Sequence, residues 1–195
     1  MEYPKMEEYA IENNIPIMQK EGVDFLINIA LENNSKTCLE IGSAIGYSAI
    51  MMTSNIDDFK VETLELNEDR YNEALKNIDL YNQKNNIYIH NGDALEFNID
   101  DLVIKEYDFL FIDAAKAQYK KFFEKYMPLI KKGGYCIVDN LDFHGMIYDI
   151  DNIKNRNTKQ LVKKIKRFKD WIFNNEEYNV EYFKIGDGIC VIRRR

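Results

Sequence analysis

Short apolar segments rich in β-branched residues alternate along this chain with longer segments of helical periodicity, and no other feature constrains the fold as strongly. Strands are predicted at Lys36–Ile41, Lys60–Leu66, Ile87–His90, Tyr107–Ile112 and Gly134–Val138. Helices are predicted at Ile17–Asn33, Ile45–Ser54, Glu68–Asn82 and Ala115–Lys131, with Lys132-Gly133-Gly134 ending the last of them. Strands that alternate with helices form a parallel α/β sheet with helices on both faces.

The alternation changes in the last third of the chain. One long helix is predicted at Thr158–Asn174, and two strands follow at Asn179–Ile185 and Gly188–Arg193. Gly186-Asp187-Gly188 between them has the composition of a hairpin turn, so these strands are antiparallel. We therefore expect a seven-stranded, mostly parallel sheet with an antiparallel C-terminal strand. Because no linker rich in Pro, Gly or Ser interrupts the chain, residues 1–195 should form a single domain.

Composition restricts the class of protein further. Hydrophobic residues make up 46% and charged residues 30% of the chain, which excludes a disordered or collagen-like protein. The three cysteines are widely spaced and are expected to be buried thiols. No apolar segment approaches the ~18 residues of a membrane span, and the acidic amino terminus lacks the features of a signal peptide. The sequence therefore favours a cytoplasmic protein.

Charge is distributed unevenly along the chain. The formal net charge is −7, which argues against a general nucleic-acid-binding protein. Residues 154–169, here called the basic strip, contain eight Lys or Arg and no Asp or Glu, so the remainder of the chain carries 18 − 33 = −15. Helical periodicity alone favours a solvated face for this strip, because its basic residues lie largely off the apolar stripe of Leu161, Ile165, Phe168 and Ile172.

A glycine-containing loop joins the first predicted strand to the following helix, with the sequence Glu40-Ile41-Gly42-Ser43-Ala44-Ile45-Gly46-Tyr47-Ser48. Glycine there permits a tight turn and close approach of a ligand, and the helix N-terminus presents free N–H groups. The loop fits neither the dinucleotide fingerprint G-x-G-x-x-G nor the P-loop, which needs G-K-[ST]. Because it has no cationic residue, it suits an uncharged or cationic ligand segment better than a pyrophosphate.

Acidic residues at the ends of the next two strands extend this site. Glu65 lies about 20 residues beyond the glycine loop, where a carboxylate can accept hydrogen bonds from ribose hydroxyls. Gly92-Asp93-Ala94 follows the third strand, at a position able to hold an adenine edge. Acidic side chains at strand ends are often only solvated, so neither Glu65 nor Asp93 alone is strong evidence for a ligand. Their order on this topology nevertheless predicts a nucleoside ligand at the switch point of the sheet.

Asp113 ends one apolar strand, and Asp139-Asn140 ends the next one along the chain. The carboxyl ends of adjacent parallel strands meet at one edge of the sheet, where ligands bind. Two carboxylates and an amide oxygen suit Mg²⁺ and not Zn²⁺, which prefers His and Cys. The structural alternative is a helix cap at Asp113 and a turn at Asp139-Asn140. Capping does not explain acids at the ends of two neighbouring buried strands, so we predict a metal held by Asp113, Asp139 and Asn140.

Lys116 and Tyr119 follow Asp113 on the first turn of the next predicted helix and should face the same cleft. Lys116 is a candidate proton acceptor, with a solvated helix lysine as the alternative. His90 and His144 have no Ser or Cys partner pattern and give no case for a catalytic triad, although His144 could line the substrate side.

Together these motifs resemble those of the cation-dependent class I S-adenosylmethionine (SAM) O-methyltransferases of the catechol and caffeoyl-CoA type. The resemblance runs from about Ile15 to the end and rests on E-I-G-S-A-I-G-Y-S, the acid after strand two, G-D-A, D-A-A-K-x-x-Y and D-N. It implies a Rossmann-like fold, SAM and Mg²⁺ as cofactors, and a homodimer. The resemblance also implies roles for individual residues. Cofactor contacts are implied for Met18, Gly42, Ser48, Glu65, Asp93, Ala94 and Asp113. Metal ligation is implied for Asp113, Asp139 and Asn140, and catalytic roles are implied for Asp113 and Lys116. Family members usually carry another helix ahead of the segment near Lys5, whereas this chain begins almost there.

Shorter segments resemble more narrowly the bacterial tRNA 5-hydroxyuridine methyltransferases, which convert the wobble base to 5-methoxyuridine. These segments are Ile15–Met18, Phe111–Tyr119, Asn155–Asn157, Trp171–Asn174 and Ile185–Gly188. An anticodon loop presents unstacked bases and dense phosphate, so the resemblance gives the basic strip and Arg193–Arg195 a role as phosphate contacts. We therefore predict SAM- and Mg²⁺-dependent O-methylation of wobble 5-hydroxyuridine in tRNA.

Two alternatives stay open at the level of sequence. The first is a small-molecule catechol or hydroxycinnamoyl-type O-methyltransferase with the same metal chemistry. The second is a non-catalytic nucleoside-binding module, against which the full set of Asp113, Lys116, Asp139 and Asn140 argues.

Overall fold

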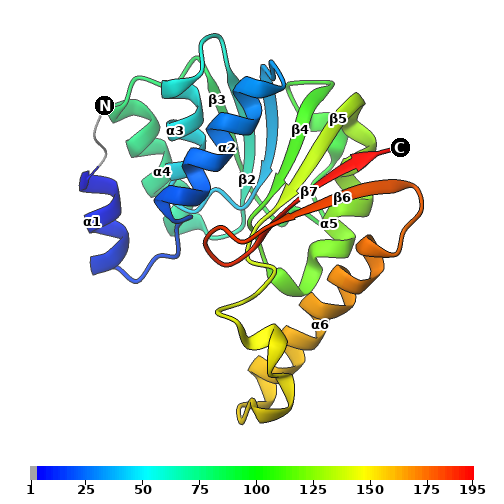
Figure 1. Ribbon diagram of the computed structural model, residues 1–195. Coiled ribbons are helices and arrows are strands. Elements are labelled where there is room, and N and C mark those ends of the chain that lie inside the picture. Colours follow the sequence, from blue (N-terminus) through cyan, green and yellow to red (C-terminus); the bar gives the residue numbers. More distant parts are fainter. Residues whose placement is uncertain (1–3) are drawn as a thin grey trace.

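The computed structural model describes residues 4–195, which form a seven-stranded sheet flanked by helices (Figure 1). In spatial order the strands are β3 (Ile87–Asn91), β2 (Lys60–Glu65), β1 (Thr37–Ile41), β4 (Tyr107–Ile112), β5 (Ile130–Val138), β7 (Ile189–Arg194) and β6 (Tyr178–Phe183). Strands β1 to β5 are parallel, whereas β7 is antiparallel to both of its neighbours. The predicted mostly parallel sheet with an antiparallel C-terminal strand is confirmed.

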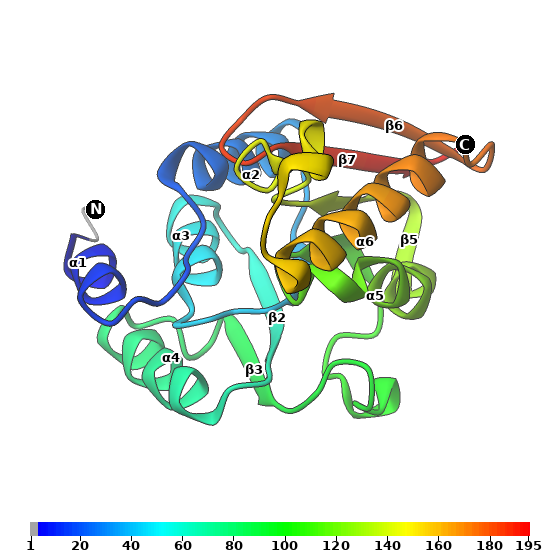
Figure 2. The ribbon, with the colours of Figure 1, turned by 90° about the horizontal axis from the view of Figure 1, so that it is seen from below.

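Helices cover both faces of the sheet, as predicted (Figures 1 and 2). One face carries α1 (Pro4–Glu12), α2 (Lys20–Glu32), α3 (Tyr47–Asn55) and α4 (Glu68–Leu80), and the other carries α5 (Tyr119–Tyr126) and α6 (Arg156–Phe173). The buried apolar side chains accordingly divide into two cores, one on each face. Parallel strands buried on both faces are apolar along most of their length, which is the sequence pattern that predicts this sheet.

Two expectations about the chain as a whole can be checked directly. Cys38, Cys136 and Cys190 are free and buried, as expected. Within residues 4–195, no helix is both long enough and apolar enough to cross a lipid bilayer.

The predicted helix Ala115–Lys131 is wrong in its length. One 3₁₀ turn precedes α5, which ends at Tyr126, and a second 3₁₀ turn follows it. Pro128 lies in that second turn, and proline has no N–H with which to continue a helix. β5 then begins at Ile130, so the predicted glycine pair lies in a strand and does not end a helix. A side chain at Gly134 would overlap a backbone carbonyl of the neighbouring strand β4, so glycine is required there.

Helix α1 was missed by the sequence prediction. Proline occupies its first position, where a missing N–H leaves no hydrogen bond unmade. Met6 and Ala10, one helical turn apart, are buried against the rest of the fold. The Tyr47 hydroxyl on α3 donates a hydrogen bond to the Glu7 carboxylate and attaches the helix. The next helix, α2, begins at Lys20, so the residues just before it are free to line the site described below.

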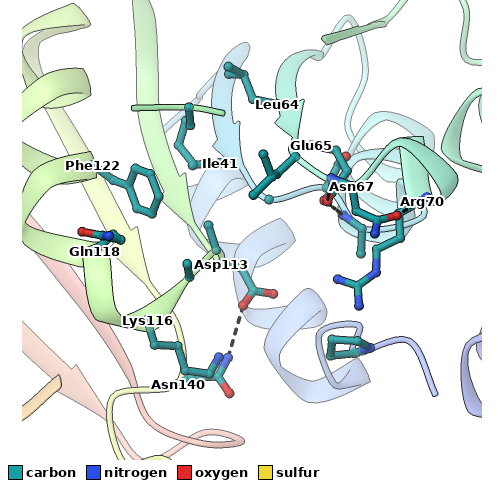
Figure 3. Close-up of a pocket in the computed structure, with 18 of the residues that line it drawn as sticks. Ile41, Leu64, Glu65, Asn67, Arg70, Asp113, Lys116, Gln118, Phe122 and Asn140 are labelled. Atoms are coloured by element: carbon teal, nitrogen blue, oxygen red, sulfur yellow. Dashed lines mark hydrogen bonds between the residues drawn. The ribbon is translucent and has the colours of Figure 1, made fainter. Parts of the chain in front are cut away.

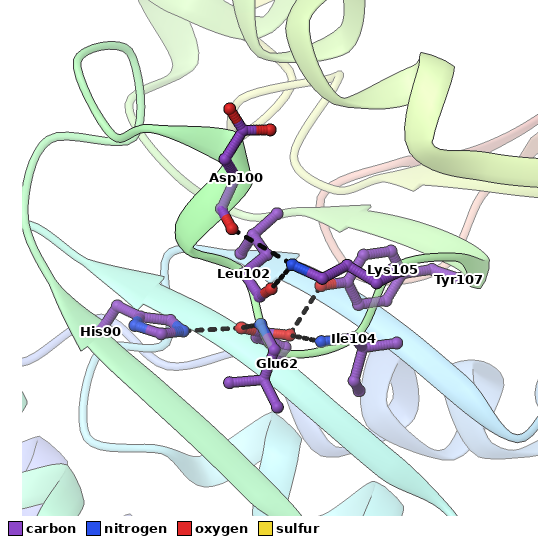
Figure 4. A network of polar contacts seen from close by, with 8 residues as sticks. Glu62, His90, Asp100, Leu102, Ile104, Lys105 and Tyr107 are labelled. Carbon is purple, nitrogen blue, oxygen red and sulfur yellow. Dashed lines mark hydrogen bonds and ion pairs between the residues drawn. The ribbon is translucent and has the colours of Figure 1, made fainter.

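A buried carboxylate organises the sheet near its β3 edge (Figure 4). The two oxygens of Glu62 accept hydrogen bonds from the Val103 N–H (2.7 Å), the Ile104 N–H (2.8 Å) and the Tyr107 hydroxyl (2.7 Å), and His90 Nε2 lies 2.7 Å away. Burial alone raises the pKa of Glu62, but these hydrogen bonds hold it below its ordinary value. The network fixes the connection between β3 and β4 and gives His90 a structural contact, away from the site described below.

Candidate active site

A cavity of about 960 Å³ opens at the carboxyl ends of β1 to β4. Every residue that the resemblance assigns to the cofactor lines it, namely Met18, Gly42, Ser48, Glu65, Asp93, Ala94 and Asp113. Lys116 and Asn140 line the same cavity, on the side of β4 and β5 (Figure 3). The predicted nucleoside-binding residues therefore share one cavity with Asp113 and Asn140, two of the three predicted metal ligands, whereas Asp139 is buried and does not line it.

The glycine loop passes close to the end of β4. Gly42 has a φ of +97°, which lies in the region that favours glycine. A Cβ atom there would lie 2.5 Å from the carbonyl oxygen of Asp113. Gly46, with a φ of +81°, forms the N-cap of α3, so the predicted helix begins at Tyr47 and its first N–H groups face the loop.

Glu65 holds this loop in place. Its carboxylate accepts hydrogen bonds from the N–H groups of Ala44 (2.8 Å) and Asn67 (2.9 Å). A carboxylate has about four acceptor positions, so Glu65 retains capacity for the hydroxyl groups of a ligand. Asp93 likewise accepts from the Leu95 N–H at 2.8 Å and still lines the cavity. Both acids combine a contact within the chain with exposure to the site.

Asp113, Asp139 and Asn140 meet where β4 and β5 end. Asn140 Nδ2 lies 2.8 Å from Asp139 Oδ2 and 3.3 Å from Asp113 Oδ1 (Figure 3). Burial raises the pKa of Asp113 to about 8, and the charge of the neighbouring Asp139 adds to this shift. Burial likewise raises the pKa of Asp139 to about 6. The fold thus holds the buried carboxylate of Asp139 near the half-buried carboxylate of Asp113, in a place where two negative charges are unfavourable.

This donor set is limited to oxygen ligands. In the part of the chain that the structure describes, no group of three or more His, Cys, Asp or Glu side chains is arranged to hold a metal. A cation here would depend on the two carboxylates and the amide oxygen of Asn140. The amide nitrogen faces the carboxylates in this structure, and a half-turn of the amide presents its oxygen instead.

Of the three other side chains that were predicted near this cluster, only Lys116 lines the cavity. Lys116 lies beside Asn140 and lines the cavity (Figure 3). Tyr119 does not face the cleft, because the 3₁₀ turn before α5 directs it into the core, where its hydroxyl donates to the Asp139 carbonyl at 2.8 Å. His144 does not line the cavity either, since its Nδ1 lies 2.9 Å from Asp187 and its side chain is 67% exposed.

Several other residues line the cavity and were not predicted as site residues, among them Arg70, Phe122, Phe143 and Leu161. The aromatic and leucine side chains have the spacing of core residues, so periodicity gives no signal for them. The approach of Arg70 to the cavity depends on the cap of α4. Asn67 caps α4 by accepting the Arg70 N–H at 2.9 Å, which places the first turn of this helix at the rim of the cavity.

Leu161 on α6 is the one residue of the basic strip that lines the cavity within the described chain. Several of its cations are exposed, among them Lys163, Lys164 and Arg167. Arg193–Arg195 lie at the end of the antiparallel strand β7, which is the edge of the sheet opposite to the cavity. The reversed direction of β7 thus carries these arginines away from the cavity, and their predicted contact with phosphates stays a prediction.

Fold and site together define a Rossmann-like methyltransferase. A Staphylococcus aureus protein provisionally described as a caffeoyl-CoA O-methyltransferase is 39% identical, with a TM-score of 0.92 over 98% of this chain and 91% of that one. An O-methyltransferase from Bacillus cereus, solved in complex with SAH, has a TM-score of 0.83 at 24% identity and covers 98% of this chain and 90% of that one. Caffeoyl-CoA O-methyltransferase 3 of Nicotiana tabacum is 26% identical over 195 residues, or 93% of this chain and 77% of that protein.

The O-methyltransferase family model matches residues 4–195. The chain therefore belongs to the O-methyltransferase family, and the resemblance stated from the sequence is confirmed at that level.

Another buried carboxylate, Glu40, lies beneath the glycine loop near the end of β1. It is fully buried and accepts hydrogen bonds from the hydroxyls of Ser48 and Thr63, the latter at 2.6 Å. Burial raises its pKa from 4.5 to about 7, although the two hydroxyls oppose the shift. Through Ser48, the protonation state of Glu40 bears on the first turn of α3.

This shift predicts how stability depends on pH. The native state holds a proton on Glu40 between pH 4.5 and about 7, where the unfolded chain has lost it. The resulting stabilisation is full below pH 4.5 and is lost as pH rises through about 7. We expect Glu40→Gln, which cannot ionise, to gain about 3 kcal/mol relative to the unmodified chain between about pH 5 and pH 8. Urea denaturation of both chains at about pH 5 and pH 8 measures this gain. If the free energies of unfolding of the two chains differ by the same amount at both pH values, the prediction is contradicted.

Proposed function

We propose that this protein is a SAM-dependent O-methyltransferase that transfers the methyl group to a hydroxyl oxygen beside a bound divalent cation. The cavity supports the donor, because it places the glycine loop, Glu65 and Asp93 in the order that a nucleoside with an extended tail requires. Ser43 also lines this cavity, and its buried hydroxyl has no hydrogen-bond partner within the described residues. An unsatisfied buried hydroxyl in a cavity is typical of a site that binds a ligand.

Asp113, Asp139 and Asn140 would hold the cation, for which Mg²⁺ is the natural candidate given three oxygen donors. The raised pKa values of the two carboxylates support this assignment, since a positive charge between them offsets their repulsion. When bound, such a cation supplies Lewis acidity that lowers the pKa of an acceptor hydroxyl and orients its oxygen.

The chain itself contributes position and proton transfer. Lys116 lies at the same end of the cavity as Asp113 and Asn140, so it is placed to accept the proton of the acceptor hydroxyl. Phe122 and Phe143 line the cavity and exclude water from the transfer. Methyl transfer needs donor and acceptor atoms in line, and a site built on adjacent strand ends holds both in fixed positions.

We propose wobble 5-hydroxyuridine of tRNA as the acceptor. The observation that carries this proposal is the position of the basic strip along α6, whose Leu161 lines the cavity. An acceptor base in the cavity would bring the phosphates of its own strand to these cations. Seven of the eight cations lie on α6 and occupy roughly 20 Å of helix, which suits several phosphates in a row better than a single anionic group.

A second candidate acceptor is a small molecule of the catechol or hydroxycinnamoyl-CoA type. The relatives described as caffeoyl-CoA O-methyltransferases favour it. The two candidates are separated by assaying methyl transfer from SAM to an anticodon stem-loop containing 5-hydroxyuridine and, in parallel, to catechol and caffeoyl-CoA. Turnover of the RNA alone supports the first candidate, and turnover of the small molecules alone replaces it with the second.

Asp139→Ala is expected to abolish methyl transfer to every acceptor while leaving the chain folded. The raised pKa of Asp139 means that its buried charge opposes folding, so removing it should leave the free energy of unfolding unchanged or higher in the absence of metal. Activity with Mg²⁺ and urea denaturation are measured together. Asp149→Ala, which alters an exposed acid of the following loop, is the matched control. Near-normal turnover by Asp139→Ala would refute the metal assignment.

Lys163→Glu combined with Lys164→Glu is expected to weaken binding of the anticodon stem-loop and to leave SAM binding unchanged. Each lost phosphate contact should reduce the slope of log Kd against log salt by roughly 0.7 to 0.9, so the pair should reduce it by about 1.5. The control is Lys60→Glu with Arg194→Glu, the same charge change at the opposite edge of the sheet. Equal effects of the two pairs, or RNA binding that does not depend on salt, would count against tRNA.

A further inference from the structure

The cavity contains a cation that the proposed reaction does not use. Arg70, on the first turn of α4, lines the cavity, and its side chain extends into it (Figure 3). In the part of the chain that is described, only Arg70 and Lys116 bring positive charge to the cavity lining, while Glu65, Glu68, Asp93 and Asp113 bring negative charge. Lys116 belongs to the end where the metal ligands lie, so Arg70 is the cation of the opposite wall.

The guanidinium of Arg70 has no counter-ion in residues 4–195. Its main-chain N–H is used by the Asn67 cap, but its side chain makes no hydrogen bond or ion pair within this range. The nearby Glu65 carboxylate already accepts from the N–H groups of Ala44 and Asn67. A half-buried guanidinium with five unused donors is well matched to a planar oxyanion supplied by a ligand.

The face of α4 that carries Arg70 packs against the glycine loop. Ala74, one turn further along, would lie 3.4 Å from a Cβ built at Gly46, and Asn77 donates to the Ile45 carbonyl at 3.0 Å. Residues four apart share a helix face, so Arg70 lies above the same loop, on the side of the cavity. The loop residue Ser43, whose buried hydroxyl has no partner in the described chain, lines the cavity at this end as well.

The order of strands indicates which part of SAM reaches this end. With Asp93 after β3 at the adenine, Glu65 after β2 at the ribose and Asp113 after β4 near the reacting methyl group, the amino-acid tail extends over the glycine loop after β1. The acidic lining of the cavity suits the sulfonium and the ammonium of SAM. It repels the carboxylate, which needs a cation of its own.

We propose that Arg70 binds the α-carboxylate of SAM and so selects a donor that carries an intact amino-acid tail. The proposal rests on the proposed function, because it takes SAM as the ligand of this cavity. The glycine loop has no cation of its own, but α4 supplies one from across the cavity.

The test compares SAM with decarboxylated SAM, which lacks only the carboxylate, by isothermal titration calorimetry without metal or acceptor. The unmodified chain should bind SAM roughly tenfold or more tighter than the decarboxylated compound. Arg70→Gln should weaken SAM binding by roughly tenfold and change binding of the decarboxylated compound by less than about twofold, which removes the preference. Lys76→Gln removes the same charge from an exposed position on α4 and should preserve the preference.

Each outcome decides between the assignments. An unmodified chain that binds neither compound contradicts the proposed function. An unmodified chain that binds both equally overturns the role of Arg70 alone, and this comparison stands even if Arg70→Gln fails to fold. Equal weakening of both compounds by Arg70→Gln also overturns that role. The role of Arg70 is likewise overturned if Arg70→Gln leaves SAM binding unchanged and weakens binding of the stem-loop RNA. That result would assign the guanidinium to a phosphate.

Discussion

The proposed function depends on two carboxylates at the ends of neighbouring parallel strands, the half-buried Asp113 and the buried Asp139. Burial and mutual repulsion raise the pKa of Asp113 to about 8, and burial raises that of Asp139 to about 6, so ionisation of both carboxyls opposes folding. The sheet nevertheless holds both side chains at one amide, that of Asn140. Arrangements of this kind are concentrated at functional sites, where a bound charge offsets the repulsion. The proposed metal, donor and acceptor positions all follow from this one constraint.

The short helix α5 fixes both ends of the site relative to each other. At its start, the Tyr119 hydroxyl donates to the carbonyl of Asp139 at 2.8 Å. At its end, the Lys125 ammonium donates to the carbonyls of Ala94, Leu95 and Phe97 at 2.7 to 2.8 Å, and so holds the turn that follows β3. The helix therefore connects the proposed metal ligands to the predicted adenine position, and the core packing on this face of the sheet supports both.

The fold and most of the candidate site could be predicted from the sequence because both depend on strand ends. A residue that follows a buried parallel strand must emerge at the carboxyl edge of the sheet, and this argument alone brought Glu65, Asp93, Asp113 and Asn140 into one cavity. Helix boundaries were less predictable. The helical pattern before β5 continues past the point where Pro128 ends it.

What the sequence could not give were contacts made across the cavity. Arg70 reaches the site only because the Asn67 cap sets where α4 begins, and Phe122 reaches it only because α5 starts with a 3₁₀ turn. The direction of Tyr119 into the core follows from the same turn. Such contacts depend on the packing of one element against another, which periodicity along the chain does not encode.

The central claim is that Asp113, Asp139 and Asn140 hold one divalent cation next to the donor pocket. Its most direct test uses Mn²⁺ in place of Mg²⁺ and observes the ¹³C-labelled methyl group of SAM bound to the protein by NMR. The account predicts that one equivalent of Mn²⁺ strongly broadens the methyl resonance and that excess Mg²⁺ restores it. A methyl resonance that stays sharp while SAM is bound and Mn²⁺ is present would contradict it.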